Sequence, residues 1–441
     1  MHSRPRLPVK PPRVISRPIA ACLRFVSGQS QLARVGVVLG VSCALYACGA
    51  ETPRAVPGPG AGTEPREPIA ARSEPERSAK RTTDGVLALK NLSAQISSLE
   101  ARSTRLPGDT HSVIQLANLL LARAQFVGTY DDLARAEQLA STLLANGAEN
   151  DAAARLLAAR VKGGLHDFAA AAKHRLAANP AAPADALTSV ATGDNLEGAH
   201  ALATTAARDQ PSLQSVSALA SVEAALGHYE LADTLYQDSL ESYRDVSPLP
   251  VAWVQFQRGV MWSEMAAQPE RALPLYQDAV RRLPGYVTAN VHLAELEYQR
   301  GEHSQATRRL EDLVANATLQ DPEPLGLLGE WLQSGDAQRS TELIRNASAR
   351  YEQLLARFPL AFLDHGAEFF AGPGRDPSRA LRLALRNLEN RRTPRAFQVA
   401  IQSATAAGDS AKACQLSAQA TRERRVNPTL GETLQTLSCS N

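Results

Sequence analysis

The sequence predicts an all-α protein, a right-handed superhelical α-solenoid of about nine helix-turn-helix repeats. Three observations lead to this prediction. The 441 residues are 44% hydrophobic but only 5% aromatic, and the apolar share is mostly Ala and Leu, which favour helices over strands. No sustained alternation of β-branched residues follows residue 83. A six-residue pattern also recurs at a distance typical of repeat proteins. This much apolar sequence excludes a wholly disordered chain.

Residues 1–47 have the composition of an export signal peptide with a long basic leader. They contain seven Lys or Arg residues and no Asp or Glu. Residues 35–47 then form an apolar stretch of about thirteen residues, shorter than the roughly twenty that span a bilayer and typical of a signal-peptide core.

The end of this stretch resembles a bacterial lipobox. Leu45 stands at −3 and Ala47 at −1 relative to Cys48. Tyr46 at −2 departs from the usual small or β-branched residue. The resemblance implies that Cys48 carries the lipid and becomes the new N-terminus. In such lipoproteins Gly49, rather than Asp, is associated with the outer membrane. Ordinary cleavage nearby, with Cys48 unmodified, is the alternative.

Residues 48–83 are predicted to be the lipidated Cys followed by a disordered tether. Pro, Gly, Glu and Ser dominate this segment, so it lacks the side chains for a core. About 35 such residues span roughly 30 Å, which would hold a folded domain away from a membrane surface.

Helical patterns begin at residue 84. Leu89, Leu92, Ile96 and Leu99 step by three, four and three residues, which places one apolar stripe on a first helix. The Pro-Gly pair at 107–108 ends it. We therefore predict a solenoid over residues 84–426 and a C-terminal capping segment over residues 427–441.

The predicted solenoid region contains internal sequence repeats. The sequence LYQDSL at 235–240 recurs as LYQDAV at 275–280. A turn pattern of Gly, then Ala five residues later, begins at Gly164, Gly227, Gly301 and Gly408. These features indicate stacked helix pairs.

The second helices resemble those of the tetratricopeptide repeat. Ala272, Tyr276, Ala279 and Pro284 fit that family's A-x3-F…P pattern. Small residues let paired helices approach to about 8–9 Å, and the aromatic ring fills the space beside them. The small residues taken as markers average about 35 residues apart: Ala134, Ala169, Ala199, Ala232, Ala272, Ala306, Ala347, Ala380 and Ala413.

Sequence motifs for catalysis are absent. The chain has no Walker loop, G-x-S-x-G, H-E-x-x-H or C-x-x-C motif, so we predict no enzyme activity, no cofactor and no metal. His365 and Glu368 could share a helix face and bind a metal, but without a third ligand we interpret them as packing or surface residues. His166 and His174 are interpreted as solvated surface.

Two cysteines near the C-terminus form an even pair if Cys48 is lipidated. In an oxidising compartment, Cys414 and Cys439 either form a disulfide that fixes the capping segment or remain two buried thiols.

The resemblance implies a concave groove, lined by first helices, that suits an extended peptide or partner helix. In the family register, its lining includes Trp253, Phe256, Val260, Thr288, Val291, Glu295 and Tyr298. Trp253 and Phe256 are either partner anchors or packing residues between repeats.

Charge is unevenly distributed. Residues 209–330 carry 18 acidic and 8 basic residues, and residues 375–425 carry 11 basic and 4 acidic residues. Each of these two segments is either a solvated face or one of two oppositely charged ends of the solenoid, and such ends would favour head-to-tail self-association. No series of stacking aromatic residues interleaves the basic end, so we predict no nucleic-acid binding.

These observations predict a non-enzymatic, membrane-anchored scaffold that binds other envelope proteins or extended peptides, with its lipid in the periplasmic face of the outer membrane. Assembly of outer-membrane, secretion or pilus complexes is the associated process. Two alternatives stay open: an envelope enzyme or ligand-binding protein with a pocket inside the superhelix, and a cytoplasmic protein with a misassigned start.

Overall fold

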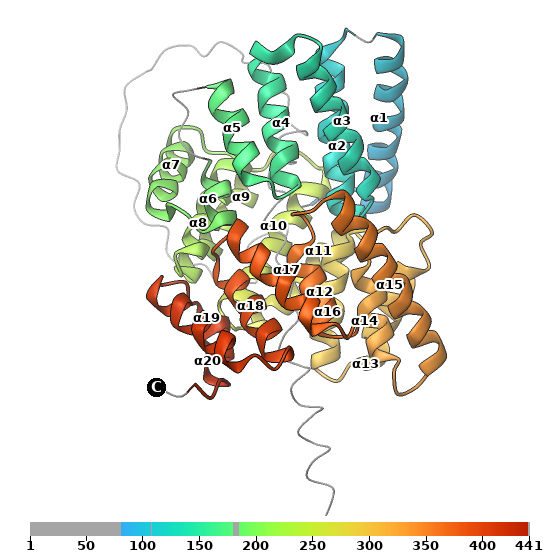
Figure 1. Cartoon of the computed structure of the whole chain (residues 1–441). Helices are drawn as coiled ribbons and strands as arrows, with labels where there is room; N and C mark the ends of the chain where they lie inside the picture. Colours follow the sequence, from blue (N-terminus) through green and yellow to red (C-terminus); the bar gives the residue numbers. More distant parts are fainter. Residues whose placement is uncertain (1–80, 107, 180–184, 440–441) are drawn as a thin grey trace, which may run out of the picture.

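The computed structural model describes residues 81–106, 108–179 and 185–439, and every regular element within these ranges is a helix (Figure 1). Helix α1 (Gly85–Arg105) leads into nine consecutive helix pairs, and α20 (Pro428–Gln435) follows them. The prediction of an all-α solenoid of about nine repeats is confirmed. Cys48, the predicted signal peptide and most of the predicted tether lie outside the described residues.

The first helices of the nine pairs are α2 (Thr110–Val127), α4 (Ala152–Gly164), α6 (Ala186–Thr192), α8 (Leu213–Ala225), α10 (Pro248–Val260), α12 (Val287–Gln299), α14 (Glu323–Trp331), α16 (Leu363–Ala371) and α18 (Pro394–Ala406). The second helices are α3 (Tyr130–Ala145), α5 (Phe168–Ala178), α7 (Leu196–Asp209), α9 (Tyr229–Ser242), α11 (Pro269–Arg282), α13 (His303–Val314), α15 (Ala337–Arg357), α17 (Pro377–Asn390) and α19 (Ser410–Arg422). A 3₁₀ turn (Ala148–Asn150) precedes α4, and a π-helical turn, η5 (Met261–Met265), extends α10.

Local sequence sets the helix boundaries. Asp side chains cap many N-termini: Asp109, Asp167 and Asp376 each accept a hydrogen bond from a backbone N–H of the first turn, which satisfies a donor that the helix leaves unpaired. Helix α1 buries Leu92 and Ile96, as its apolar stripe predicts.

Second helices present their small residues to the first helices. Seven of the nine predicted markers are at most 1% exposed. The other two are wrong by two residues, because Ala136 and Ala171 are the buried positions and Ala169 is exposed. For Ala169, the cause lies in the preceding turn. The residue with positive φ there is His166 (φ 56°) rather than Gly164, so the buried position of α5 lies two residues later than predicted.

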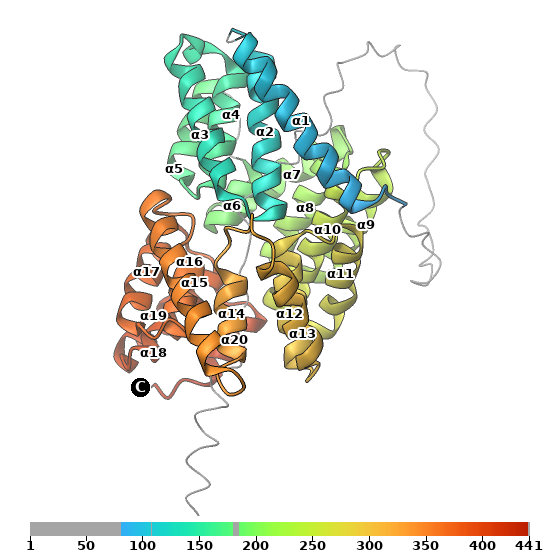
Figure 2. The same ribbon diagram turned by 90° about the vertical axis from the view of Figure 1, so that its right-hand side faces the viewer.

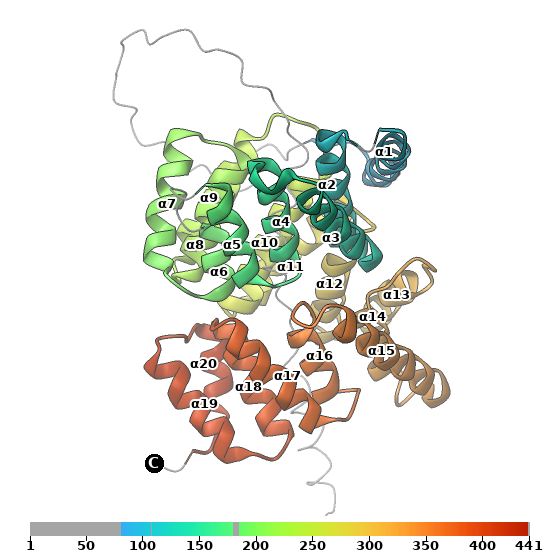
Figure 3. The same ribbon diagram turned by 45° about the horizontal axis from the view of Figure 1, so that its top comes forward.

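The superhelix turns far enough to contact itself. Figure 2 shows α2–α5 standing above α14–α17, and Figure 3 shows α18–α20 beside α6 and α8. At one junction the backbone N–H of Gln320 donates to the carbonyl of Gly128 (3.1 Å), and Arg357 pairs with Asp131. We call this contact the first closure junction.

A second closure junction joins the α4–α6 region to the chain after α17. The Asn390 side chain donates to the carbonyl of His166 (2.9 Å), and the backbone N–H of Arg392 donates to the carbonyl of Thr192 (2.8 Å). Gly193 follows with φ 80°, and a Cβ there would lie 2.8 Å from the Arg392 carbonyl oxygen. Glycine is required at this position by both its φ and the close backbone approach.

Within the described residues, no helix is both long and apolar enough to cross a membrane.

Candidate functional site

The predicted groove residues do not line an open groove. Trp253, Phe256 and Val260 are at most 2% exposed and belong to an apolar cluster formed mainly by α8–α12. The Phe256 ring contacts the ring of Tyr286 with centroids 5.2 Å apart. Of the two interpretations of Trp253 and Phe256, their burial favours packing between repeats, and Val260 is buried in the same cluster.

The other four predicted groove residues have mixed positions. Val291 is fully buried. Tyr298 is half-buried, and its ring stacks on Trp331 with centroids 4.2 Å apart. Thr288 and Glu295, both under 10% exposed, line two cavities inside the superhelix. These two residues lead to the candidate site.

The larger cavity encloses about 720 Å³, part of it continuous with solvent. We call it the closure cavity, because its walls come from both sides of the first closure junction. Helices α2 and α3 and the end of α4 contribute one side, and α12, residues 321–323, α15 and α16 contribute the other.

A hydrogen-bonded carboxyl lies in its wall. The Tyr130 hydroxyl donates to Asp321 Oδ2 (2.8 Å), and the backbone N–H of Glu323 donates to Asp321 Oδ1 (3.0 Å). Burial and the charge of Glu323 raise the pKa of Asp321. A cation placed here would lower that pKa.

An ion pair lies next to it. His365 Nδ1 is 3.5 Å from Glu323 Oε1. Burial lowers the pKa of His365, but the charges of Glu323 and Asp364 outweigh it and raise that pKa to about 9. The same pairing holds the pKa of Glu323 below its ordinary value, against the effect of burial. At neutral pH the pair is therefore charged.

The inner face beyond the cavity is also rich in buried charge. Arg391 pairs with Asp364, and Arg395 pairs with Glu368. The π-helical turn η5 carries Glu264, whose Oε1 lies 3.0 Å from His292 Nδ1. Extra residues inserted in a helix as a π turn occur frequently at functional sites.

Two polar side chains of the closure cavity have buried atoms without a hydrogen-bond partner in the described part of the chain. Gln125 is 8% exposed and His166 is 7% exposed. Within the described residues, three of their atoms have no hydrogen-bond partner: Nε2 and Oε1 of Gln125, and Nδ1 of His166. The interpretation of His166 as solvated surface is wrong. His365, expected to be packing or surface, is a half-buried member of an ion pair.

Sequence reasoning missed this cavity. Gln125, His166, Asp321 and His365 are far apart in the chain, and only the closure of the superhelix brings them together. The one local signal was His166, a non-glycine residue at a repeat turn. Ala267 and Arg375 hold the same conformation, so that signal alone would not have singled it out.

A metal centre is not formed by this cluster. Across residues 81–106, 108–179 and 185–439, no three His, Cys, Asp or Glu side chains meet in a way that could hold a metal ion. His365 and Glu368 instead pair with Glu323 and Arg395, respectively.

At the C-terminus, Cys414 of α19 and Cys439 are joined by a disulfide, with Cα atoms 5.6 Å apart. The covalent bond connects the end of the chain to the last helix pair. Helix α20 packs there through Leu430, which is fully buried.

Surface charge is less polarised than the composition implies. In the basic segment, Arg391 and Arg395 form the internal pairs described above, and Arg392 and Arg379 pair with Glu423 and Glu352. In the acidic segment, Asp233 accepts two hydrogen bonds from Arg258, both 2.9 Å long. Many of the charges are therefore neutralised within the chain.

Comparison with known proteins gives a repeat assignment. The tetratricopeptide repeat family matches residues 265–330. No curated protein sequence matches the chain.

Several solved structures resemble the chain at low identity. They include the APC/C hetero-tetramer Cut9-Hcn1 (14% identity, TM-score 0.39, 74% of this chain and 63% of that one). Another is a human IFIT1 dimer with PPP-AAAA (13% identity, TM-score 0.41, 75% of this chain and 78% of that one). A third is the TPR domain of P58(IPK) (16% identity, TM-score 0.24, 80% of this chain and 94% of that one). The chain is thus an all-α solenoid of helix pairs, and its residues 265–330 match the tetratricopeptide repeat.

Proposed function

We propose that this protein is a non-enzymatic scaffold of the bacterial cell envelope, anchored by a lipid on Cys48 and binding other proteins through its helical repeats. The observation that carries the proposal is the array of nine helix pairs, an architecture that presents extended surfaces to protein partners. The anchor rests on the lipobox resemblance at residues 45–48.

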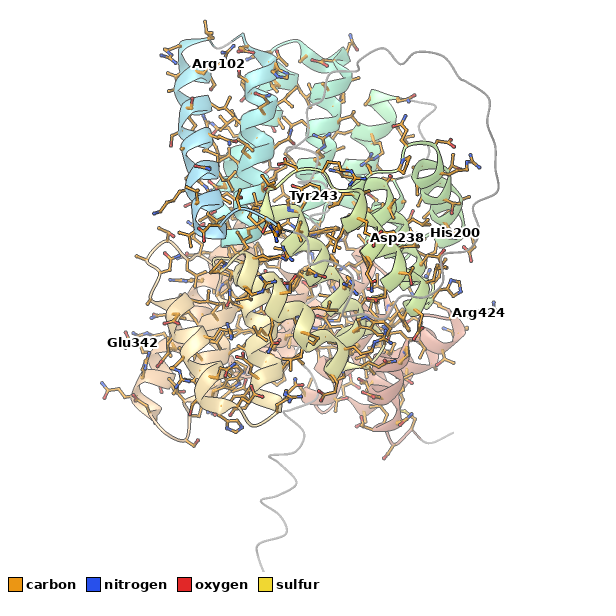
Figure 4. All side chains as sticks on the ribbon, turned by 180° about the vertical axis from the view of Figure 1, so that it is seen from behind. Arg102, His200, Asp238, Tyr243, Glu342 and Arg424 are labelled. Carbon is orange, nitrogen blue, oxygen red and sulfur yellow. A yellow bond between two sulfur atoms is a disulfide. The ribbon has the colours of Figure 1, made fainter. Side chains whose placement is uncertain are left out.

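Partner binding is assigned to the outer surface, because the inner face is filled or enclosed. Charged side chains occupy that surface, as Figure 4 shows for Arg102 of α1 and Glu342 of α15 at the outer edges of the ribbon. The residues after Cys48 would let this surface reach partners roughly 30 Å from the membrane. Assembly of an outer-membrane, secretion or pilus complex is the proposed process, and head-to-tail self-association remains part of the proposal.

The anchor is tested by metabolic labelling with a palmitate analogue. The wild-type chain should take up label and sediment with outer membranes. Cys48→Ser should lose both properties, and Cys43→Ser, a matched change within the apolar stretch, should keep them. An unlabelled, soluble wild-type chain would end the proposal of a lipid anchor.

The scaffold role is tested by crosslinking in intact cells, followed by capture of the anchored chain. The expected result is a reproducible envelope partner that Cys48→Ser loses. Recovery of the chain without any crosslinked envelope protein contradicts the scaffold.

The closure cavity supports a second candidate function, ligand binding inside the superhelix. Its enclosed volume and clustered carboxyl groups distinguish it from a shallow open groove.

A further inference from the structure

The closure cavity has a polar wall whose hydrogen-bonding capacity is only partly used. Gln125 on α2 and His166 after α4 both line it, both are more than nine-tenths buried, and both present atoms without a partner among the described residues. Leaving a buried polar atom unpaired costs about 1–3 kcal/mol. Two such side chains in one cavity, contributed by different repeats, indicate a ligand that pairs with them.

His166 offers an acceptor. Its backbone partner is Leu360, and because Nδ1 is unpartnered, Nε2–H makes that bond. The Nδ1 atom of this tautomer carries a lone pair. Burial lowers the pKa of His166 to about 3, so the ring is neutral at physiological pH. A ligand must therefore bring an N–H or O–H donor to this point.

Gln125 offers a donor and an acceptor side by side. Its Nε2 and Oε1 are both unpartnered, and a primary or secondary amide is the group that satisfies the two together, through its carbonyl and its N–H. A hydroxyl or an amine would satisfy one atom well and leave the other unpaired.

The charges in the cavity wall favour a cationic ligand. Within the cavity wall His365 balances Glu323, which leaves the Asp321 carboxyl as the remaining ionisable acid. Tyr130 donates to it, but within the described residues no Lys or Arg side chain forms an ion pair with it, and His365 acts on it only as a nearby charge. An ammonium group is favoured here, and an anion would face Asp321 and Glu323. Leu133 and Phe362 line the apolar part of the wall.

We propose that the closure cavity is a binding site for a small cationic amide with an apolar side chain. Gln125 recognises its amide group, His166 accepts a hydrogen bond from it, and the Asp321 carboxyl faces its ammonium group. This goes beyond the proposed scaffold role and does not depend on it, because the site needs neither the lipid nor a partner protein.

The probe is L-leucinamide, titrated into the purified full chain by calorimetry and by thermal melting. It carries one ammonium, one primary amide and one branched apolar side chain. Two matched compounds separate these features: isoamylamine lacks the amide, and L-leucine replaces the amide with a carboxylate. Leucinamide should bind saturably and raise the melting temperature. Each comparison compound should bind at least about tenfold more weakly, since each loses buried hydrogen bonds.

Gln125→Met is the variant that tests the mechanism. Methionine nearly matches glutamine in shape and removes both unpartnered atoms, so the melting temperature should stay equal or rise while leucinamide binding falls at least about tenfold. Gln115→Met makes the same change earlier on α2, outside the cavity lining, and should leave binding unchanged.

Three results overturn the proposal. One is no saturable binding of leucinamide to the wild-type chain at about 10 mM. Another is equal binding of isoamylamine. The third is a Gln125→Met variant that melts lower than the wild type and still binds leucinamide, which would make Gln125 a structural residue. None of these outcomes bears on the lipid anchor or the scaffold.

Discussion

The Tyr130 hydroxyl donates a 2.8 Å hydrogen bond to Asp321 across 191 residues of sequence. Tyr130 begins the second helix of the first pair, and Asp321 precedes the seventh pair. The Tyr130 ring also meets Phe362 with centroids 4.8 Å apart. One residue thus fastens an early turn of the superhelix to a later one, and it does so in the wall of the closure cavity.

Tyr130→Phe should lower the free energy of unfolding by about 1–3 kcal/mol, because it leaves the buried Asp321 carboxyl short of a donor. Urea denaturation measures the change. Tyr298→Phe serves as the control, since Tyr298 packs through its ring face on Trp331, and it should change stability by less than about 0.5 kcal/mol. Equal effects of the two variants would show that the Tyr130–Asp321 bond contributes nothing.

Gly193→Ala should destabilise the chain more than Gly227→Ala. Both glycines have positive φ, 80° and 88°, but a Cβ at Gly193 would lie 2.8 Å from the Arg392 carbonyl oxygen, and at Gly227 it would meet nothing within 4 Å. Gly227→Ala therefore carries only the conformational cost of about 1–2 kcal/mol. Thermal melting of both variants measures the excess, which reports the second closure junction. Identical melting temperatures would contradict the close approach.

Stability should fall as pH rises from about 6.5 to 9.5. The folded-state pKa of His365, about 9, lies above its ordinary 6.5, so the stabilisation is complete below pH 6.5 and is lost as pH passes through 9. The loss is at most about 3 kcal/mol. His166, whose folded-state pKa burial lowers to about 3, is neutral in the folded protein throughout this window. Its titration in the unfolded chain adds a small slope of opposite sign near pH 6.5 and none at higher pH.

Urea unfolding at several pH values measures that slope. His365→Gln should flatten that slope between pH 6.5 and 9.5. His174→Gln is the control, because His174 lies on α5 away from Glu323, and it should leave the slope unchanged. A wild-type curve with no decline in this window would mean that the His365–Glu323 pair does not stabilise the fold.

The disulfide between Cys414 and Cys439 should protect α20 from local opening. Closing a loop of 25 residues contributes about 3 kcal/mol in the chain-entropy model. Reduction, or the double change of both cysteines to Ser, should speed hydrogen exchange in α20 while leaving α8–α13 unchanged. Intact mass should rise by about 2 Da on reduction. Alkylation of both thiols without reductant would refute the bond.

The repeat pattern was predictable because it is local. Each small residue in the first turn of a second helix recurs with the turn that precedes it, so Ala232, Ala272 and Ala306 could be found from neighbouring residues alone. The register failed at Ala169, because the turn conformation that glycine favours is held there by His166. Such a substitution is invisible to a pattern that expects glycine.

The interior could not be predicted in the same way. Trp253 and Phe256 occupy positions that the family register assigns to a groove, but both are buried, mainly among side chains of the consecutive helices α8–α12. The array also closes on itself. The curvature that closes it is the sum of small rotations between successive pairs, which no single repeat encodes. Gln125 and His365 consequently show no relation in the sequence, although both line one cavity.

Closure also changes how the chain is expected to fold. An open solenoid has contacts only between neighbouring repeats, so its ends fray and its middle can fold early. Here contacts such as Arg392–Thr192 span about half of the described chain, which raises contact order and slows folding. A chain emerging N-terminus first would leave the polar wall around Gln125 open to water until the residues near 321–365 arrive. The cavity therefore forms only late in synthesis, and a truncation before residue 319 would leave its polar wall exposed permanently.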